Sequence, residues 1–305
     1  MPELPEVETV VRDLKKRVVG RRILDVWTDW PNYFLDPKSR IRGIQGKKKL
    51  FLDFKKNITG RKIVNVERRG KNILIHLSGS YLILIHLKMT GHPLLGCWRL
   101  EGGGWKSIQN SKEMQDSKNA FIRLIFFLDG KKVESMLALS DMRRFAKVLC
   151  GPKDEILNLK ELKGLGPEAL EVSLGDFKKI FETKKGAVKS VLMDQSFVVG
   201  IGNIYSDEIL YLAGIHPLSR VEKIKGQKIK ILLDLIKKVL RRGIKLRGTS
   251  SDDFRDTFGK KGGYGKVILV YQRHGLKCEK GHKIERTKVG GRSAHFCPEC
   301  QELIK

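Results

Sequence analysis

The sequence lacks any hydrophobic run long enough to cross a bilayer. A membrane-spanning helix needs about 20 consecutive apolar residues, whereas the apolar stretch Tyr81–Leu87 has the length of one buried strand. The N-terminus also lacks the basic and then apolar pattern of a secretory signal, since Glu3 and Glu6 make it acidic. We therefore expect a cytoplasmic protein with no membrane association and with reduced thiols.

Cysteine is scarce and is distributed unevenly. There are 5 cysteines, an odd number, and three of them lie between Cys278 and Cys300. This pattern favours a metal site over a disulfide framework. We expect the other two, Cys97 and Cys150, to be structural thiols without a special role.

Acidic side chains are few relative to basic ones. The chain has 61 Lys and Arg against 34 Asp and Glu, which gives a formal net charge of +27. Such an excess favours a polyanionic partner. Nucleic acid is the first candidate, and an anionic membrane surface is the second.

The hydrophobic pattern predicts a helix at the start of the chain and then a β-sandwich. Apolar residues three or four positions apart between Val7 and Val18 predict the helix. Short apolar runs broken by glycine predict the strands. The predicted strands are Ile23–Trp27, Leu50–Phe54, Ile63–Val66, Ile73–Leu77, Leu82–Leu87, Phe121–Leu128, Glu134–Leu139 and Ala146–Leu149. The polar stretch Gly96–Lys118 between them is predicted to be a long loop.

Beyond Gly151 and Pro152 the spacing of apolar residues becomes helical. The predicted helices are Phe177–Lys185, Val188–Gln195, Ile204–Ala213 and Lys225–Arg242. A glycine-rich segment, Gly243–Gly265, follows them, and two strand-like pieces surround the cysteine cluster. The fold class is therefore α+β, with predicted domains at residues 1–150, 151–265 and 266–305.

The cysteine cluster has the spacing of a zinc site. Cys278-x3-His282 and Cys297-x2-Cys300 together supply three thiolates and one imidazole, a donor set that suits tetrahedral zinc. With four protein ligands the ion would be structural, because a catalytic zinc keeps a position open for water. The alternative is three reduced surface thiols and an unrelated histidine. His274 and His295 are the fallback ligands.

Two interpretations of the N-terminal residues remain open on the residues alone. Proline and glutamate suit the first turn of a helix, which makes Pro2, Glu3 and Glu6 an ordinary helix start. If Met1 is removed, however, Pro2 becomes a secondary amine with a pKa near ~7.7–8, so a useful neutral fraction is present at pH 7. Such an amine can attack a sugar C1′ and form an iminium. Glu3 could exchange the protons.

Several segments carry a family resemblance, in this order: Met1–Val10, Arg68–Lys71 with His86–Gly91, Asp141–Phe145, Leu165–Glu168, Asp194–Tyr205 and the zinc finger. They resemble those of the formamidopyrimidine-DNA glycosylases, a family of helix–two-turn–helix DNA glycosylases and AP lyases. The resemblance covers nearly the whole chain and favours the nucleophile interpretation of Pro2.

The resemblance implies roles for five residues in the chemistry. Pro2 would be the Schiff-base nucleophile, Glu3 the acid and base that opens the deoxyribose, and Glu6 a support for both. Lys71 would bind the phosphate near the lesion and take part in elimination, although by itself it reads as a solvated charge at a strand end. Arg292, between the zinc ligands, would assist the second elimination.

The resemblance also implies DNA contacts. Met89, Arg143 and Phe145 would fill the hole left by an extruded base, although the two apolar residues could equally be core. Asn203 and Lys184 would clamp the backbone together with Arg292, although Gly200-x-Gly202 before Asn203 also suits an ordinary helix cap. The segment Gly243–Gly265 would be the mobile loop that covers the extruded base.

Two departures from the family pattern stand out. Gly281 lies where the family has its second cysteine, and His282 follows it. Asn119 lies where many relatives have a DNA-contacting histidine, so it is the expected DNA contact at this position, next to the enlarged Gly96–Lys118 insertion.

The function implied is a base-excision repair enzyme that removes 8-oxoguanine and formamidopyrimidines from double-stranded DNA and then cuts the strand by β,δ-elimination. Its partner would be duplex DNA with oxidised bases or abasic sites, its only cofactor one structural Zn²⁺, its state a monomer, and its location the nucleoid. One alternative is an endonuclease VIII-type glycosylase for oxidised pyrimidines. Another is a lesion-binding protein without chemistry, for which charge, zinc finger and wedge residues would remain useful.

Overall fold

The computed structural model describes residues 1–34, 44–130, 134–250 and 253–305. Its contacts divide the chain into two compact units. The first unit comprises Met1–Pro2, Glu6–Lys163 and Arg247–Gly263, and the second comprises Glu3–Pro5, Gly164–Leu246 and Tyr264–Lys305. The predicted domain boundaries after residues 150 and 265 remain a proposal.

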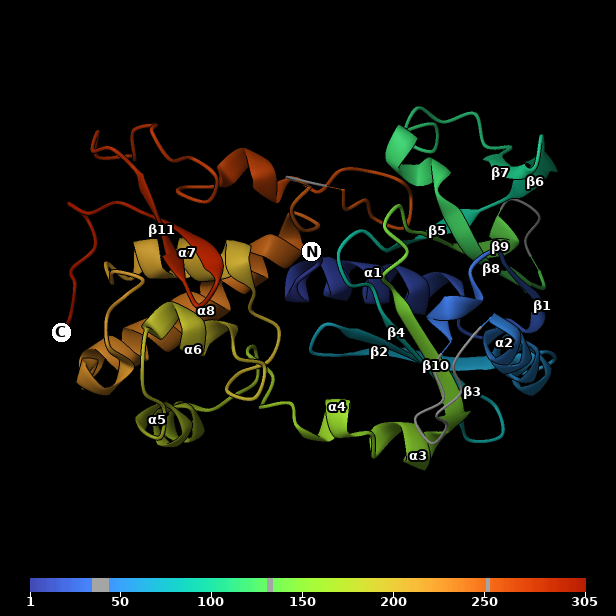
Figure 1. Cartoon of the computed structure of the whole chain (residues 1–305), viewed down its shortest axis with the longest axis horizontal. Helices are drawn as coiled ribbons and strands as arrows, with labels where there is room; N and C mark the ends of the chain where they lie inside the picture. The colour runs from blue at the N-terminus through green and yellow to red at the C-terminus, as the bar shows by residue number, and fades with distance from the viewer. Residues whose placement is uncertain (35–43, 131–133, 251–252) are drawn as a thin grey trace. The chain divides into compact units, whose positions relative to one another are not determined.

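The first unit contains the predicted β-sandwich. Two four-stranded antiparallel sheets have the strand orders β1-β8-β9-β5 and β10-β4-β3-β2 (Figure 1). The first sheet is built from β1 (Ile23–Thr28), β5 (His92–Gly96), β8 (Ile122–Leu128) and β9 (Met136–Ser140). The second is built from β2 (Ile63–Arg69), β3 (Asn72–Leu77), β4 (Tyr81–His86) and β10 (Lys147–Pro152).

The predicted N-terminal helix is present as α1 (Leu4–Arg17). Its apolar face, from Val7 through Leu14, is fully buried in the core of the first unit together with side chains from both sheets. Burial of such a stripe, more than intrinsic helix propensity, stabilises a helix of this length.

One predicted strand is wrong. Leu50–Phe54 lies inside helix α2 (Ile44–Ile58). Phe54 and Ile58 are buried four residues apart, whereas Leu52 is exposed, which is the pattern of a helix and not of a strand. The apolar run was too short for its period to distinguish the two structures.

The predicted loop Gly96–Lys118 is partly ordered as a hairpin. Strands β6 (Trp98–Glu101) and β7 (Gly104–Ser107) pair, and the turn between them uses Gly102 and Gly103, both at positive φ. Two consecutive positive φ values are what a tight hairpin turn requires, and glycine adopts them without strain. The remaining short elements of this unit are η1 (Pro31–Tyr33), η2 (Ser117–Ala120), α3 (Lys153–Leu157) and α4 (Lys160–Lys163).

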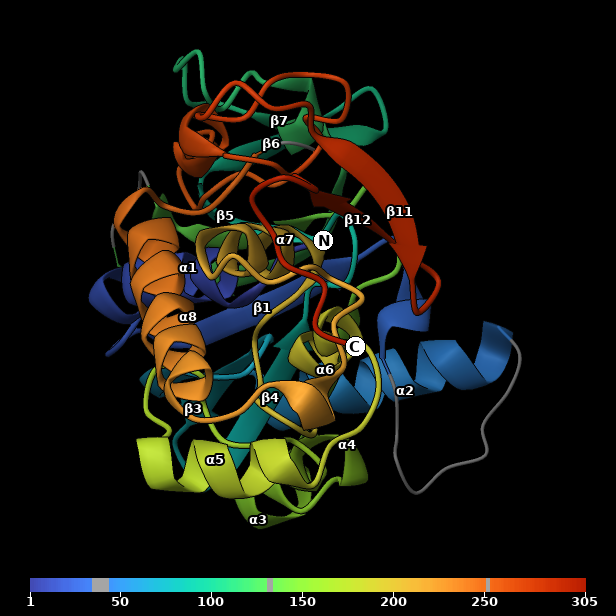
Figure 2. The same ribbon diagram turned by 90° about the vertical axis from the view of Figure 1, so that its left-hand side faces the viewer.

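The second unit is helical and ends in a two-stranded hairpin, as predicted. Helix α7 (Asn203–Leu212) lies next to β12 of the hairpin (Figure 2). Its other elements are α5 (Leu174–Glu182), α6 (Val188–Met193), η4 (Val221–Lys223), α8 (Gln227–Lys245), η5 (Tyr264–Val267), β11 (Glu285–Val289) and β12 (Arg292–Phe296). Phe177, Phe181 and Phe197 form an aromatic cluster in its core. Among the described residues, no helix is both long and apolar enough to span a membrane.

Candidate active site and metal centre

The carboxylate of Glu3 is held by the N-terminus of α7. Its Oε2 accepts a hydrogen bond from Gly202 N at 2.6 Å, and its Oε1 accepts one from Ile204 N at 2.8 Å. Only 2% of Glu3 is exposed. The N–H groups and the dipole at a helix N-terminus stabilise a negative charge. They therefore offset the cost of burying the Glu3 carboxylate.

The backbone next to Glu3 is also fixed by close contacts. Leu4 N donates to Gly200 O at 3.0 Å. Gly200 has φ +109°, and an ideal Cβ there would lie 2.6 Å from the Leu4 side chain. The glycines before α7 therefore serve a close approach of the N-terminal residues, which goes beyond helix capping. Pro2, the residue before Glu3, is buried, and the Met1 that precedes it is exposed.

Glu6 has a positioning role in the first unit. Its Oε1 accepts a hydrogen bond from Thr249 N at 2.7 Å. Gly248 has φ +80°, and an ideal Cβ there would lie 2.8 Å from Glu6 Cγ. Glu6 thus holds the start of the segment after α8, and it is itself fully buried.

Lys71 is not a solvated surface charge. It follows Gly70, which has φ +58°, in the turn between β2 and β3, and only 7% of it is exposed. Nearby, Arg68 Nε donates to Glu8 at 2.9 Å. Burial raises the pKa of Glu8, but its hydrogen bonds to Arg12 and Arg68 outweigh this and lower it, so Glu8 stays ionised. The burial of Lys71 rules out the alternative that it is a solvated charge at a strand end.

The three predicted wedge residues lie on two loops of the first unit. Phe145 is 58% exposed and Arg143 is exposed, whereas Met89 is half-buried. A large aromatic side chain left in water is not core, so the core alternative for Phe145 is wrong.

Asp141 joins these two loops and was missed as a site residue by the sequence reasoning. It is completely buried, and its Oδ2 accepts hydrogen bonds from Tyr33 Oη at 3.0 Å and Ala146 N at 2.9 Å. Its Oδ1 is bonded to the Thr90 hydroxyl, whose oxygen in turn accepts a hydrogen bond from Arg143 N at 3.0 Å. In the sequence, Asp141 begins the segment Asp141–Phe145 that carries part of the family resemblance, but nothing there indicated its hydrogen bonds to distant residues.

In the second unit, Asn203 faces a polar hollow. The hollow has a volume of about 340 Å³ and is lined by Asn203, Tyr271, Gln272, His274, Arg286, Ser293 and His295. Within the described part of the chain, Asn203 Oδ1 is buried without a hydrogen-bond partner. The exposed Arg292 begins β12, and Lys184 Nζ pairs with Asp194 at 2.8 Å.

Asn119 lies in the interior of the first unit. It is buried, and its carboxamide bonds to His92 Nε2 at 3.0 Å and to Glu113 O at 2.7 Å. A side chain already committed in this way is not free to contact DNA, which argues against the predicted role.

The four predicted zinc ligands are together. The donor atoms of Cys278, His282, Cys297 and Cys300 all lie within 4.8 Å of one another. Cys278 N donates to His282 O at 2.8 Å across a tight turn in which Gly281 has φ +85°. Three thiols and one imidazole in this arrangement fit a closed tetrahedral zinc, which makes the ion structural.

The pKa values of the thiols reflect this crowding. Burial raises the pKa of Cys278, but hydrogen bonds from the Lys280 and His282 amides outweigh this and lower it. Burial and the neighbouring thiols raise the pKa of Cys300. The fallback ligands His274 and His295 are outside the cluster, as are Cys97 and Cys150, which are only half-buried.

Three family models match the chain in the order of its parts. Residues 1–148 match the formamidopyrimidine-DNA glycosylase N-terminal domain, and residues 164–255 match the formamidopyrimidine-DNA glycosylase H2TH domain. Residues 275–303 match a zinc finger found in FPG and IleRS. The chain belongs to the formamidopyrimidine-DNA glycosylase family.

Relatives of this family match over the full length. The formamidopyrimidine-DNA glycosylases of Pelotomaculum thermopropionicum and Heliobacterium modesticaldum are both 36% identical, over 99% of this chain and 100% of theirs. A Lactococcus lactis FPG mutant in complex with DNA containing Fapy-dG superimposes with a TM-score of 0.81 at 30% identity. That match covers 99% of this chain and 100% of the other.

His282 supplies the one imidazole among the four clustered donor groups. The match to the zinc-finger model and the clustered donor atoms agree that the chain carries a structural zinc. The matches to the family models and to the solved structure confirm the expected family and the expected α+β fold class.

Proposed function

We propose that the chain is a bifunctional DNA glycosylase and AP lyase of base-excision repair. Its substrates are oxidised purines, such as 8-oxoguanine and formamidopyrimidines, in double-stranded DNA. The observation that carries the proposal is the buried Glu3 carboxylate, compensated by the N-terminus of α7 and directly adjacent in the chain to Pro2. An ordinary helix start does not require a buried carboxylate, whose desolvation costs free energy.

Pro2 is the nucleophile in this proposal. Once Met1 is removed, its nitrogen attacks C1′ of the extruded nucleoside, and the bond from C1′ to the base breaks. Glu3 takes up the proton that the Pro2 nitrogen loses on attack and delivers it to O4′, which opens the deoxyribose ring as the iminium forms. Loss of a proton from C2′ of the resulting iminium then expels the phosphate on the 3′ side, and a second elimination expels the phosphate on the 5′ side. Lys71 and Arg292 assist these eliminations, and Glu6 supports the site.

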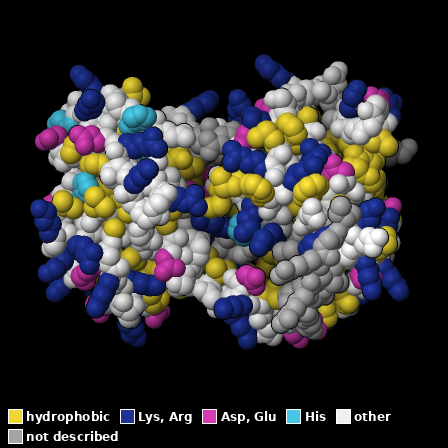
Figure 3. Space-filling view, viewed as in Figure 1, with side chains coloured by type: hydrophobic (Ala, Val, Ile, Leu, Met, Phe, Trp, Pro, Cys, Tyr) yellow, Lys and Arg dark blue, Asp and Glu magenta, His cyan; other side chains and the backbone are white. Residues whose placement is uncertain are grey.

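Met89, Arg143 and Phe145 hold the stack open in this scheme, while Asn203, Lys184 and Arg292 bind the backbone. The exposed Phe145 and Arg143 support the first assignment. Two observations support the second assignment. Asn203 Oδ1 in its polar hollow has no hydrogen-bond partner among the described residues, and many lysine and arginine side chains lie on the surface in Figure 3. The working location is the cytoplasm and nucleoid, and the domains are residues 1–150, 151–265 and 266–305.

Borohydride trapping tests the chemistry. The enzyme, with its N-terminus verified as Pro2 by mass spectrometry, is incubated with an 8-oxoguanine duplex and sodium borohydride. We expect a covalent adduct of protein and DNA, because only an imine is reduced to a stable amine. Pro2→Gly should trap slowly, and Glu3→Gln should remove almost no base. A non-catalytic lesion-binding protein would bind the duplex without giving an adduct.

One observation keeps oxidised pyrimidines as a second substrate class. The wild-type Lactococcus lactis FPG (MutM), a structural neighbour at 30% identity, has been crystallised with DNA containing an oxidised pyrimidine. Single-turnover rates on matched duplexes with 8-oxoguanine and with an oxidised pyrimidine decide between the classes. A higher rate on the pyrimidine would move the chain to the endonuclease VIII-type specificity.

A further inference from the structure

Two segments of the first unit that are distant in the sequence are tied together. One is the turn at residues 113–119, at the end of the Gly96–Lys118 insertion, and the other is residues 253–263, within the glycine-rich segment after α8. Leu95 N donates to Thr257 O at 2.8 Å, so β5 itself also bonds to the second segment. Ser251 and Asp252, which precede it, lie outside the described residues.

Two ion pairs join the segments, and each segment supplies the cation of one pair and the carboxylate of the other. Arg255 Nε donates to Asp116 Oδ2 at 2.9 Å, and Lys118 Nζ lies 2.6 Å from Asp253 Oδ1. The Arg255 side chain is almost completely buried. A buried guanidinium without its carboxylate is costly, so this pair favours one fixed position of the segment.

Asn119 makes a further contact between the two segments, at a position where they pack closely. Its Nδ2 donates to Glu113 O at 2.7 Å and to Gly259 O at 3.3 Å, while its Oδ1 accepts from His92. Gly259 has φ +76°, and an ideal Cβ there would lie 2.6 Å from Asn119 Nδ2. The two segments therefore meet closely at a position where only glycine fits.

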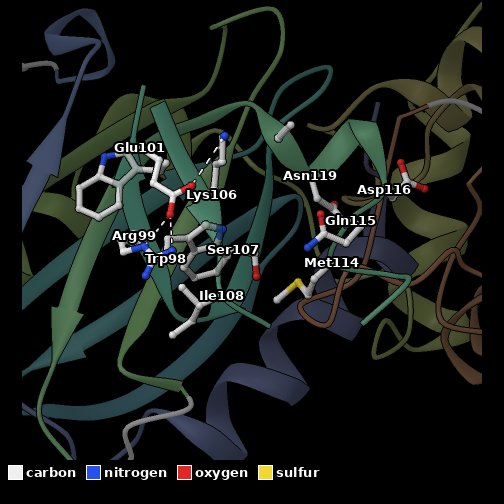
Figure 4. A pocket seen from close by; sticks show the side chains of 12 residues that line it. Trp98, Arg99, Glu101, Lys106, Ser107, Ile108, Met114, Gln115, Asp116 and Asn119 are labelled. Atoms are coloured by element: carbon white, nitrogen blue, oxygen red, sulfur yellow. Dashed lines mark hydrogen bonds and ion pairs between the residues drawn. The ribbon is translucent and has the colours of Figure 1, made fainter. Parts of the chain in front are cut away.

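The turn, and not the β6–β7 hairpin, makes these ties. A hollow of about 580 Å³ separates the two parts of the insertion, with Trp98 and Ser107 on the hairpin side and Gln115 and Asn119 on the turn side (Figure 4). On the hairpin, Arg99 pairs with Glu101 of the same strand. Arg99 has no hydrogen bond or ion pair with residues 253–263 in the part of the chain that the structure describes, so a change at Arg99 alters the insertion alone.

We propose that the turn at residues 113–119 is a dock that holds residues 253–263 in one position on the first unit before DNA binds. Arg255 and Asp116 are then positioning residues for the capture of the extruded base. This rests on the proposed function, in which the segment after α8 covers that base. Removal of a base depends on the dock, whereas strand cleavage at a site that has already lost its base does not.

The experiment compares Arg255→Gln, Asp116→Asn and the double variant with the wild type and with Arg99→Gln as the matched control. Hydrogen exchange of residues 253–263 is measured in the free protein. We expect exchange roughly tenfold or more faster in each dock variant, with the double variant no worse than either single one. Arg99→Gln should leave exchange unchanged. Because Asp116→Asn keeps an oxygen to cap η2, it tests the pair even if Arg255→Gln folds poorly.

Two activities are then measured in single turnover. In the dock variants, excision of 8-oxoguanine should fall by about tenfold, since small misplacements of substrate-holding groups are expensive, while cleavage of a preformed abasic site stays at the wild-type rate. Fast exchange of residues 253–263 in the wild type would overturn the dock. So would faster exchange in the variants with unchanged excision. Wild-type protein that neither excises nor cleaves would instead refute the proposed function, and the exchange data would still decide the docking.

Discussion

Glu3 and Gly202 are 199 residues apart in the chain, yet the Gly202 amide donates a 2.6 Å hydrogen bond to the Glu3 carboxylate. An ideal Cβ on Gly202 would lie 2.6 Å from Glu3 Oε1, inside any real contact distance. The glycine therefore determines where the carboxylate can lie.

Gly202→Ala should displace Glu3 and lower the rate of base removal by about 100-fold, because misplacement of a reacting group by about 1 Å has a cost of that size. The measurement is single-turnover excision on an 8-oxoguanine duplex. Gly175→Ala is the matched control, since a Cβ there meets only Ser173 Oγ at 3.9 Å. Equal rates for both variants would contradict the importance of this contact.

His282→Ala should abolish stoichiometric zinc binding, whereas His282→Cys should retain it, because a fourth thiolate completes the tetrahedral set equally well. Zinc content is measured by metal analysis after gel filtration, and Cys150→Ala serves as a control outside the cluster. One tightly bound zinc per chain in His282→Ala would show that another group is the fourth ligand.

Lys189→Met should destabilise the second unit by about 3–5 kcal/mol, because it leaves the fully buried Asp207 carboxylate without its cation. Among the described residues, Asp207 would then keep the His295 amide and ring as hydrogen-bond donors. Lys184→Met is the matched control, since its pair with Asp194 is partly exposed and is worth about 0–1 kcal/mol. Urea unfolding measures both, and equal losses would contradict the difference.

Stability should fall as the pH drops below 6.5. Burial, followed by the charges of Lys88 and Lys71, lowers the pKa of His86 from 6.5 to about 3. The folded state then binds fewer protons than the unfolded state between these values, so stability is complete above pH 6.5 and is lost on acidification. At about 1.36 kcal/mol per pH unit, His86 accounts for at most about 2.7 kcal/mol between pH 6.5 and 4.5.

His86→Asn tests this dependence, because its side-chain oxygen can still accept the hydrogen bond that Lys88 N donates to His86 Nδ1 at 3.0 Å. Unfolding free energies at pH 7 and pH 4.5 should differ less in the variant than in the wild type. An identical pH dependence in the two proteins would assign the acid sensitivity to other groups, such as the buried His92, whose pKa burial also lowers.

Much of the site was visible in the sequence because its chemistry requires particular residues at fixed spacings. The short motifs Cys278-x3-His282 and Cys297-x2-Cys300 predicted the cluster of donor atoms that the structure shows. Pro2 and Glu3 are neighbours in the chain, so their proximity needed no fold. By contrast, no local pattern predicted the hydrogen bonds of Asp141 and Asp207, because their partners come from distant segments.

The sequence by itself determined the fold class, through hydrophobic periods that are local properties, and the family, through motifs that resemble its members in order. The spacing of the cysteines also predicted which donor atoms cluster. Only the tertiary structure decided that Leu50–Phe54 is helical, that Asn119 is internal and that residues 253–263 rest on the turn at residues 113–119. These outcomes depend on which surfaces bury one another. Burial is a property of contacts between distant residues, and no short window of the sequence contains it.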